Sequence, residues 1–331
     1  MPNDDSIGLV LSGGGAKGAF QAGVWKAMCE LGLADRVRVI SGTSVGAINA
    51  AAFAAIRDPE TICQFWRSLV EEVATPNLRS LENATDSFRQ AADNVLAGKA
   101  FPFHGLLDRA ELERLVRGLL PSRWPEKAPE VIVTSLECRG GLMDELDSSS
   151  YRKQRFRIDE EPDAARRTSK ILASAAIPWG FDPVELDGKR YVDGGWDEKG
   201  GENIPVTPIW KEHPDIKTLV VIRCNSVESD PEPLAVHSSR NRTVIEVRPS
   251  VTLPGILGDI ASLLPDTSLL SQIPILGDFA GKLDAVAQKL RVWSGTFAFT
   301  REFANRYIKQ GYADGKSALE RHLRFTAKLN W

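Results

Sequence analysis

Two glycine-rich turns within the first fifty residues constrain the fold more than any other feature of this chain. Residues 13–18 read GGGAKG, and residues 42–46 read GTSVG. Each turn follows a short apolar run and opens a segment whose apolar residues recur at helical spacing. A repeated strand–turn–helix unit predicts an α/β fold with a mostly parallel central sheet and helices on both faces.

The remaining apolar pattern extends this fold along the chain. Strands are expected at residues 7–12, 37–41, 131–136, 154–158, 219–222 and 244–247. A helix should follow the first turn and end at the C-cap Gly32, and an alanine-rich helix is expected over 45–56. Residues 59–128 favour further helices, and a long helix is expected from about 281 to 322. Without a linker or repeat, residues 1–331 are expected to form one domain with helical insertions.

Composition narrows the class of protein. A net charge of −3 argues against nucleic-acid binding, which needs clustered Lys and Arg. The four cysteines form no C-x-x-C pair, so neither a metal site nor a disulfide framework is expected. No signal-peptide pattern and no window of about 18 unbroken apolar residues is present. We therefore expect a cytoplasmic protein that reaches a membrane, if at all, as a peripheral visitor.

The second turn has the G-x-S-x-G form of a nucleophile elbow. In such a turn a sharp strand-to-helix connection projects the Ser44 hydroxyl above the sheet edge, and Gly42 and Gly46 avoid clashes there. Ser44 is the candidate nucleophile, and a serine hydroxyl needs a base to take its proton. The plain alternative is an ordinary strand–helix turn.

The first turn offers backbone N–H groups at a helix start, which suit an anion. Its candidate oxyanion donors are Gly13, Gly14 and Gly15, with Gly14 and Gly15 favoured, and Lys17 and Gly18 support the loop. The rival interpretation is a dinucleotide-binding G-x-G-x-x-G. That fold expects an acidic residue at the end of the second strand, where this chain has the Ser44 turn.

The base is the less obvious partner of Ser44. None of the four histidines, at positions 104, 213, 237 and 322, lies in the glycine-rich strand-end setting of a catalytic histidine. Asp193 does: it follows the strand-like segment 190–192 and precedes Gly194 and Gly195. A Ser–Asp dyad is the resulting prediction, and an Asp-Gly turn is the structural alternative.

Taken in order, these motifs resemble the patatin-like phospholipases, also called patatin-like acyl hydrolases, over roughly residues 6–225. The shared segments are residues 13–18, 42–47, 173–178, 181–184, 193–195 and 203–205. The resemblance implies a three-layer α/β/α fold, a Ser44–Asp193 dyad, an oxyanion hole from Gly13–Gly15, and hydrolysis of acyl esters in lipids without a metal or cofactor. Two positions depart from it: the family often has Arg at Lys17 and an acidic residue at Ser12.

The expected function is a phospholipid or lysophospholipid acyl hydrolase that contacts membranes transiently. An NAD(P)-binding oxidoreductase and a catalytically idle lipid-binding protein remain as alternatives. The helical region at about 250–325 has no assigned role. Within it, residues 251–278 lack Lys and Arg, and either pack on the core or form a lid or lipid-facing surface. Self-association and an activating ligand stay open.

Overall fold

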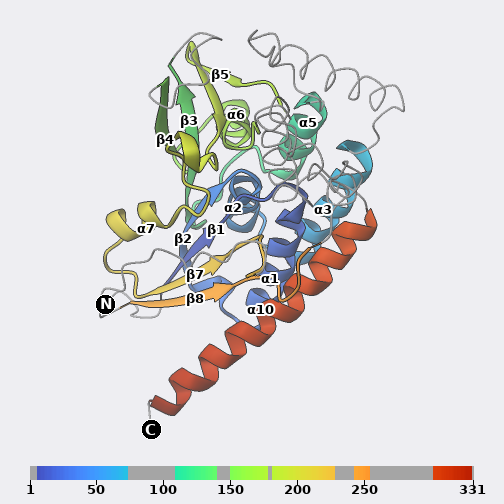
Figure 1. The fold of residues 1–331 in the computed structure, drawn as a ribbon, viewed down its shortest axis with the longest axis vertical. Helices are drawn as coiled ribbons and strands as arrows, with labels where there is room; N and C mark the ends of the chain where they lie inside the picture. The colour runs from blue at the N-terminus through green and yellow to red at the C-terminus, as the bar shows by residue number, and fades with distance from the viewer. Residues whose placement is uncertain are drawn as a thin grey trace, which may run out of the picture.

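Apolar residues alternate between two cores across a single β-sheet. A computed structural model describes residues 6–73, 109–139, 150–177, 181–227, 242–253 and 301–329. The eight strands follow the order β5-β6-β3-β2-β1-β7-β8, with β4 paired to β3 (Figure 1). The strands are β1 (Ile7–Leu11), β2 (Val37–Thr43), β3 (Glu130–Cys138), β4 (Tyr151–Arg157), β5 (Val184–Leu186), β6 (Lys189–Asp193), β7 (Thr218–Ile222) and β8 (Thr243–Val247).

Five strands are parallel, and the other three make the sheet mixed at one side. β1 pairs in parallel with β2 and β7, β2 with β3, and β7 with β8. β4 and β6 pair antiparallel to β3, and β5 pairs antiparallel to β6. The mostly parallel α/β architecture expected from the two glycine turns is therefore confirmed.

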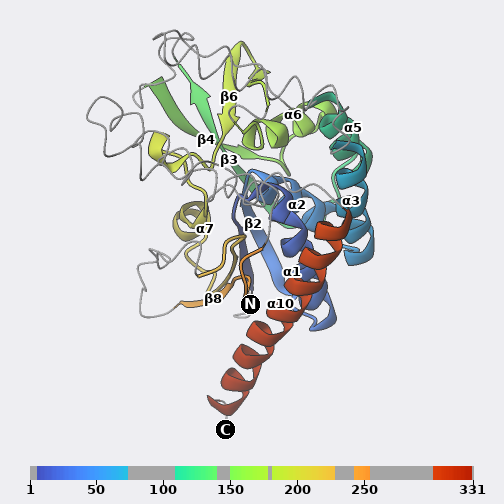
Figure 2. The same cartoon turned by 45° about the vertical axis from the view of Figure 1, so that its right-hand side comes forward.

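Helices cover both faces of this sheet (Figure 2). One face carries α1 (Gly18–Glu30), α2 (Val45–Ala55), α3 (Pro59–Val73), α5 (Arg109–Leu119), α6 (Ala164–Ser174) and α10 (Arg301–Leu329). The other face carries α7 (Val206–Glu212). In β1, Leu9 and Leu11 join the larger core and Val10 joins the smaller one with Ile209 of α7. Successive strand residues point to opposite faces, so one strand serves both cores.

The C-terminal helix α10 packs closely along α1. A Cβ on Gly311 would lie 2.0 Å from the carbonyl oxygen of Phe20, and one on Gly23 would lie 2.1 Å from that of Ile308. The two backbones therefore touch, and no larger side chain fits between them. Of the helix expected at about 281–322, the part from 301 onward lies in Arg301–Leu329, and residues 281–300 lie outside the described residues. Most of the 251–278 segment lies outside the described residues, so its role stays open.

The predicted strands are all present, with corrected boundaries. The strand expected at 154–158 is Tyr151–Arg157, and the one expected at 37–41 extends to Thr43. β5 was not expected, because a strand of three residues carries too little periodicity to be recognised in the sequence. It joins β6 through Asp187 and Gly188, whose φ angles of 53° and 71° suit a tight hairpin turn.

Candidate functional site

The ends of two strands meet at one point on β3, and this point carries the two residues that the sequence singled out. β2 runs parallel to β3 and ends with Thr43 opposite Thr134. β6 runs in the opposite direction and ends with Asp193 opposite Ser135. β4 occupies the other edge of β3, so β2 and β6 share the same edge. Ser44 and Asp193 therefore approach each other from opposite directions, although 149 positions separate them along the chain.

Ser44 occupies a strained turn between β2 and α2. Its backbone angles, φ 58° and ψ −127°, lie in a region that residues other than glycine rarely adopt. The Ser44 side chain is buried. Its amide donates a hydrogen bond to Oγ of Ser174 at 2.9 Å, and Ser174 Oγ donates in turn to the Thr134 carbonyl at 2.5 Å. The turn therefore has the shape of a nucleophile elbow, as the G-x-S-x-G motif predicts.

Asp193 is a buried carboxylate at the end of β6. Its backbone amide donates to the Ala176 carbonyl, and its Oδ1 accepts the Gly195 amide at 2.7 Å. Burial raises the pKa of Asp193 to about 6, against the weaker lowering effects of the Ser44 hydroxyl and the Gly195 amide. Oδ2 is buried without a fully formed hydrogen bond to the described residues. The carboxyl is thus dehydrated and adjacent to Ser44, which makes it more basic than an exposed aspartate.

The glycine loop lies directly beside Ser44. A Cβ on Gly13 would be 3.1 Å from Ser44 Cβ. The Gly13 amide already donates to the Asn203 carbonyl at 3.0 Å, whereas no described residue accepts a hydrogen bond from the Gly14 or Gly15 amide. Of the three candidate donors, only Gly13 therefore has its N–H group engaged by a described residue.

Close backbone approach explains the glycines around the site. A Cβ would lie 2.2 Å from the Gly46 carbonyl at Gly42, 2.3 Å from the Leu11 carbonyl at Gly46, and 2.1 Å from the Thr134 carbonyl at Gly194. At Gly18 it would collide with the Trp66 ring at 2.4 Å. The elbow, the loop and the Asp193 turn are packed backbone to backbone, so substitution at these positions must move the site.

Lys17 ends the short 3-10 helix Gly15–Lys17 and points into the protein. Its side chain is buried, and Nζ donates to Asn225 Oδ1 at 2.8 Å. This contact ties the glycine loop to the segment after β7.

A buried chain of hydrogen bonds connects the same loop to three helices. Gln21 Nε2 donates to the Ser12 carbonyl, and Asn49 Nδ2 donates to Gln21 Oε1, both at 2.8 Å. Trp66 Nε1 completes the chain by donating to Asn49 Oδ1 at 2.8 Å. α1, α2 and α3 are therefore linked to the residue that precedes the loop. Buried, mutually satisfied polar groups of this kind specify one arrangement.

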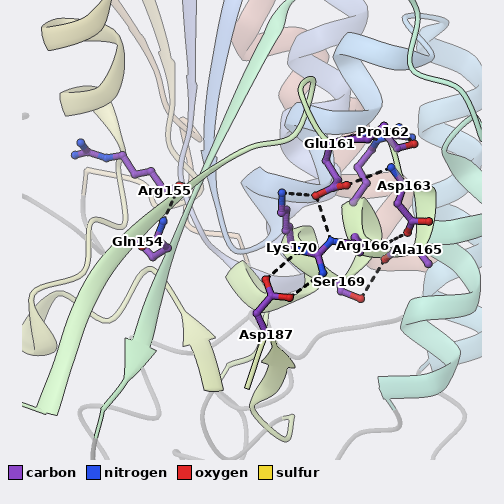
Figure 3. A network of polar contacts seen from close by, with 11 residues as sticks. Gln154, Arg155, Glu161, Pro162, Asp163, Ala165, Arg166, Ser169, Lys170 and Asp187 are labelled. Carbon is purple, nitrogen blue, oxygen red and sulfur yellow. Dashed lines mark hydrogen bonds and ion pairs between the residues drawn. The ribbon is translucent and has the colours of Figure 1, made fainter. Parts of the chain in front are cut away.

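Polar contacts around α6 hold Ser174 in place. Asp163 caps the helix by accepting the Arg166 amide at 2.7 Å. Glu161 pairs with Lys170 at 2.5 Å, and Arg166 pairs with Asp187 at 2.9 Å. Figure 3 shows both pairs beside the helix. These contacts join α6 to the preceding loop and to the β5–β6 turn. Ser174 is the last residue of this helix, and its hydroxyl accepts the hydrogen bond from the Ser44 amide.

The histidines within the described residues lie at the other end of the strands. His213 Nε2 is 3.4 Å from Glu130, the first residue of β3. His322 is a residue of α10 that faces Arg36, just before β2 begins, and burial lowers its pKa. Ser44 follows the last residue of β2. Neither of these histidines can therefore take its proton, and His104 and His237 lie outside the described residues.

Two residues of the site were not assigned roles from sequence. The Ser174 hydroxyl accepts a hydrogen bond from the Ser44 amide, and the Asn203 carbonyl accepts one from the Gly13 amide. Both belong to segments that resemble the family, 173–178 and 203–205, so the signal was present. Their roles depend on contacts across 130 and 190 positions, which no local pattern reveals.

The described residues contain no cluster of three or more His, Cys, Asp or Glu side chains that could hold a metal ion. None of the described helices combines the length and the apolar character needed to cross a bilayer.

Solved structures similar to this chain include phospholipases, at low similarity. VipD from Legionella pneumophila has a TM-score of 0.41 and 15% identity, covering 96% of this chain and 67% of that one. Human GIVD cytosolic phospholipase A2 has a TM-score of 0.43 and 11% identity, covering 95% and 61%.

The curated relatives match this chain over short segments. Over 63 residues the chain is 46% identical to lysophospholipase nte1 of Aspergillus terreus, covering 19% of this chain and 4% of that one. Over 54 residues it is 46% identical to patatin-like phospholipase domain-containing protein 7 of Mus musculus, covering 16% and 4%. The matched part is thus a small fraction of these much longer relatives.

A family model gives the broadest match. The model for patatin-like phospholipase matches residues 9–210, more than half of the chain, and this range includes both Ser44 and Asp193. The chain therefore belongs to the patatin-like phospholipase family.

Proposed function

We propose that this protein is a serine-dependent lipid acyl hydrolase that cleaves ester bonds of phospholipids or lysophospholipids. The observation that carries the proposal is the meeting of β2 and β6 on β3, which brings the Ser44 elbow to the buried carboxyl of Asp193. Family membership and the similarity to lysophospholipase nte1 support the substrate class.

The proposed reaction proceeds through an acyl-enzyme. Asp193 accepts the proton of the Ser44 hydroxyl as Oγ attacks the ester carbonyl carbon. The tetrahedral intermediate then collapses, the carbon–oxygen bond to the leaving alcohol breaks, and Asp193 returns the proton to that oxygen. In the second half, Asp193 takes a proton from water as the water oxygen attacks the acyl carbon. The bond from that carbon to Ser44 Oγ then breaks, Asp193 returns the proton to Oγ, and the fatty acid leaves. A carboxyl whose pKa is about 6 is ionised at neutral pH and more basic than an exposed aspartate.

The amides of Gly14 and Gly15 are the proposed oxyanion donors. They lie on the loop that contacts Ser44, and the described residues leave both N–H groups without an acceptor. Preorganised donors of this kind contribute most where negative charge develops, about 3 kcal/mol for one donor.

We further propose a cytoplasmic protein that contacts membranes transiently to reach its lipid substrate. The catalytic core is assigned to a single domain that includes α10, since this helix packs on α1.

The experiment that tests this function is mass spectrometry of products from mixed phospholipid vesicles, with the wild type beside Ser44→Ala. Release of fatty acid and lysophospholipid by the wild type alone supports the proposal. Vesicle binding without fatty-acid release would instead favour the idle lipid-binding protein, and calorimetric binding of NAD would favour the oxidoreductase.

A further inference from the structure

Asn203 lies where the glycine loop and the Asp193 turn come closest. Its Oδ1 is 2.4 Å from the position of a Cβ on Gly13 and 2.7 Å from that of a Cβ on Gly195. With the carboxamide in this position, a Cβ on either glycine would collide with its oxygen. The Asn203 side chain therefore lies between Gly13, which contacts Ser44, and Gly195, whose amide donates a hydrogen bond to Asp193.

The backbone of Asn203 is held from both sides. Its carbonyl accepts the Gly13 amide at 3.0 Å, and its amide donates to Asp197 Oδ1 at 2.9 Å. The neighbouring carbonyls of Glu202 and Pro205 accept hydrogen bonds from Thr43 and Ser41 of β2, at 2.7 and 2.5 Å. The strand that ends in Ser44 thus fixes the segment that carries Asn203.

We propose that Asn203 is a positioning residue that spaces the glycine loop from the Asp193 turn, and that this position requires a neutral side chain. The proposal rests on the proposed function for its effect on turnover, whereas the spacing itself is a property of the fold. By occupying the Gly13 amide, the Asn203 carbonyl also fixes which loop amides remain for an oxyanion.

Charge is the reason that a carboxamide suits this place. A Cβ on Gly195 would lie 2.7 Å from Asn203 Oδ1 and 3.0 Å from Asp193 Oδ1. The two oxygens therefore lie on the same side of Gly195. Asp197 already acts on Asp193 as a like charge, and Glu202 is neutralised by Lys153 and Arg155. A second carboxylate at 203 would oppose both the ionised base and a developing oxyanion.

The test compares two variants of opposite kind. Asn203→Asp keeps the shape and adds a negative charge, whereas Asn203→Ala removes the wedge and admits water. The matched control is Asn305→Asp on the exposed surface of α10, where Asn305 accepts a hydrogen bond from Arg67. The readouts are kcat and KM on a monomeric ester, and the pKa of Asp193 by carbon-13 NMR of labelled aspartate, assigned with Asp193→Asn. Circular dichroism selects folded variants.

We expect Asn203→Asp to lower kcat about 100-fold with little change in KM, and to raise the pKa of Asp193 by about one unit. Asn203→Ala should lower kcat about tenfold and lower that pKa, because water reaches the carboxyl. Asn305→Asp should change neither. Either folded Asn203 variant with wild-type kcat and an unshifted Asp193 pKa overturns the proposal. A shifted pKa in a protein that releases no fatty acid would uphold the placement of Asn203 and reject the proposed function.

Discussion

The backbone amide of Ser44 donates a hydrogen bond to the side-chain oxygen of Ser174, at 2.9 Å. Ser174 in turn donates to the Thr134 carbonyl of β3. One hydroxyl therefore connects the strained elbow to the last residue of α6 and to the strand on which β2 and β6 meet. A left-handed backbone at a non-glycine residue persists only when its surroundings hold it, and Ser174 is part of that support.

Ser174→Ala is therefore expected to weaken both the elbow and the fold. It leaves the buried Ser44 amide without its acceptor, which costs about 1–3 kcal/mol of unfolding free energy. We expect kcat to fall about tenfold through the displaced nucleophile. Chemical denaturation and ester hydrolysis measure the two effects. The matched control is Ser169→Ala in the same helix, because the exposed Ser169 hydroxyl bonds only within α6. Equal stability and equal kcat in the two variants would show that Ser174 does not support the elbow.

The pKa of Asp193 sets the expected pH dependence of activity. As the proposed base it must be ionised, so kcat/KM should fall with decreasing pH below about 6 and level off above it. A soluble short-chain ester avoids pH effects on vesicles. A rate that stays flat from about pH 5 to pH 8 would show that another group accepts the Ser44 proton.

The stability of the fold should also depend on the protonation of Asp193, but it should fall with rising pH where activity rises. Burial raises the folded-state pKa of Asp193 from 3.8 to about 6, so the folded protein binds more protons than the unfolded chain between these values. The free energy of unfolding therefore falls as pH rises through this window, by roughly 3 kcal/mol from this group alone. Asp193→Asn should lack this component. Urea denaturation of both proteins at about pH 4 and pH 7 measures the difference, and parallel pH profiles would contradict a buried, raised pKa.

The contact between α1 and α10 predicts a severe effect of one methyl group. Gly311→Ala would place a Cβ 2.0 Å from the Phe20 carbonyl, so the helices must separate. We expect a loss of about 3 kcal/mol or more, read from thermal denaturation. Gly118→Ala in α5 is the control, since nothing lies within 4 Å of its Cβ position. It should be neutral or stabilise by up to about 1 kcal/mol, as alanine favours helix. A small loss of stability in Gly311→Ala would mean that α10 does not pack this closely on α1.

Local sequence was sufficient for the two turns and for the strands that lead into them. An apolar strand, a glycine turn and a small-residue helix are all specified within about twenty neighbouring residues, so the Ser44 elbow was predictable. The choice of Asp193 over histidine also came from local context. The described histidines lie at the opposite end of the strands, and the role of Asp193 as the base stays a prediction.

What sequence could not supply was the pairing between distant segments. The head-to-head meeting of β2 and β6 depends on the antiparallel register of β6 on β3, which follows from no local pattern. For the same reason the engagement of the Gly13 amide by Asn203 was invisible. The role of Gly311 required knowing that α10 returns to α1 across nearly 300 positions.

The central claim is that Asp193 activates Ser44. The most direct measurement is the rate at which a fluorophosphonate modifies Ser44, followed by peptide mass spectrometry in the wild type, Asp193→Asn and Ser44→Ala. We predict modification at Ser44 in the wild type, a rate at least about 100-fold lower in folded Asp193→Asn, and none at this peptide in Ser44→Ala. Equal modification of Ser44 in the wild type and in Asp193→Asn would contradict the dyad.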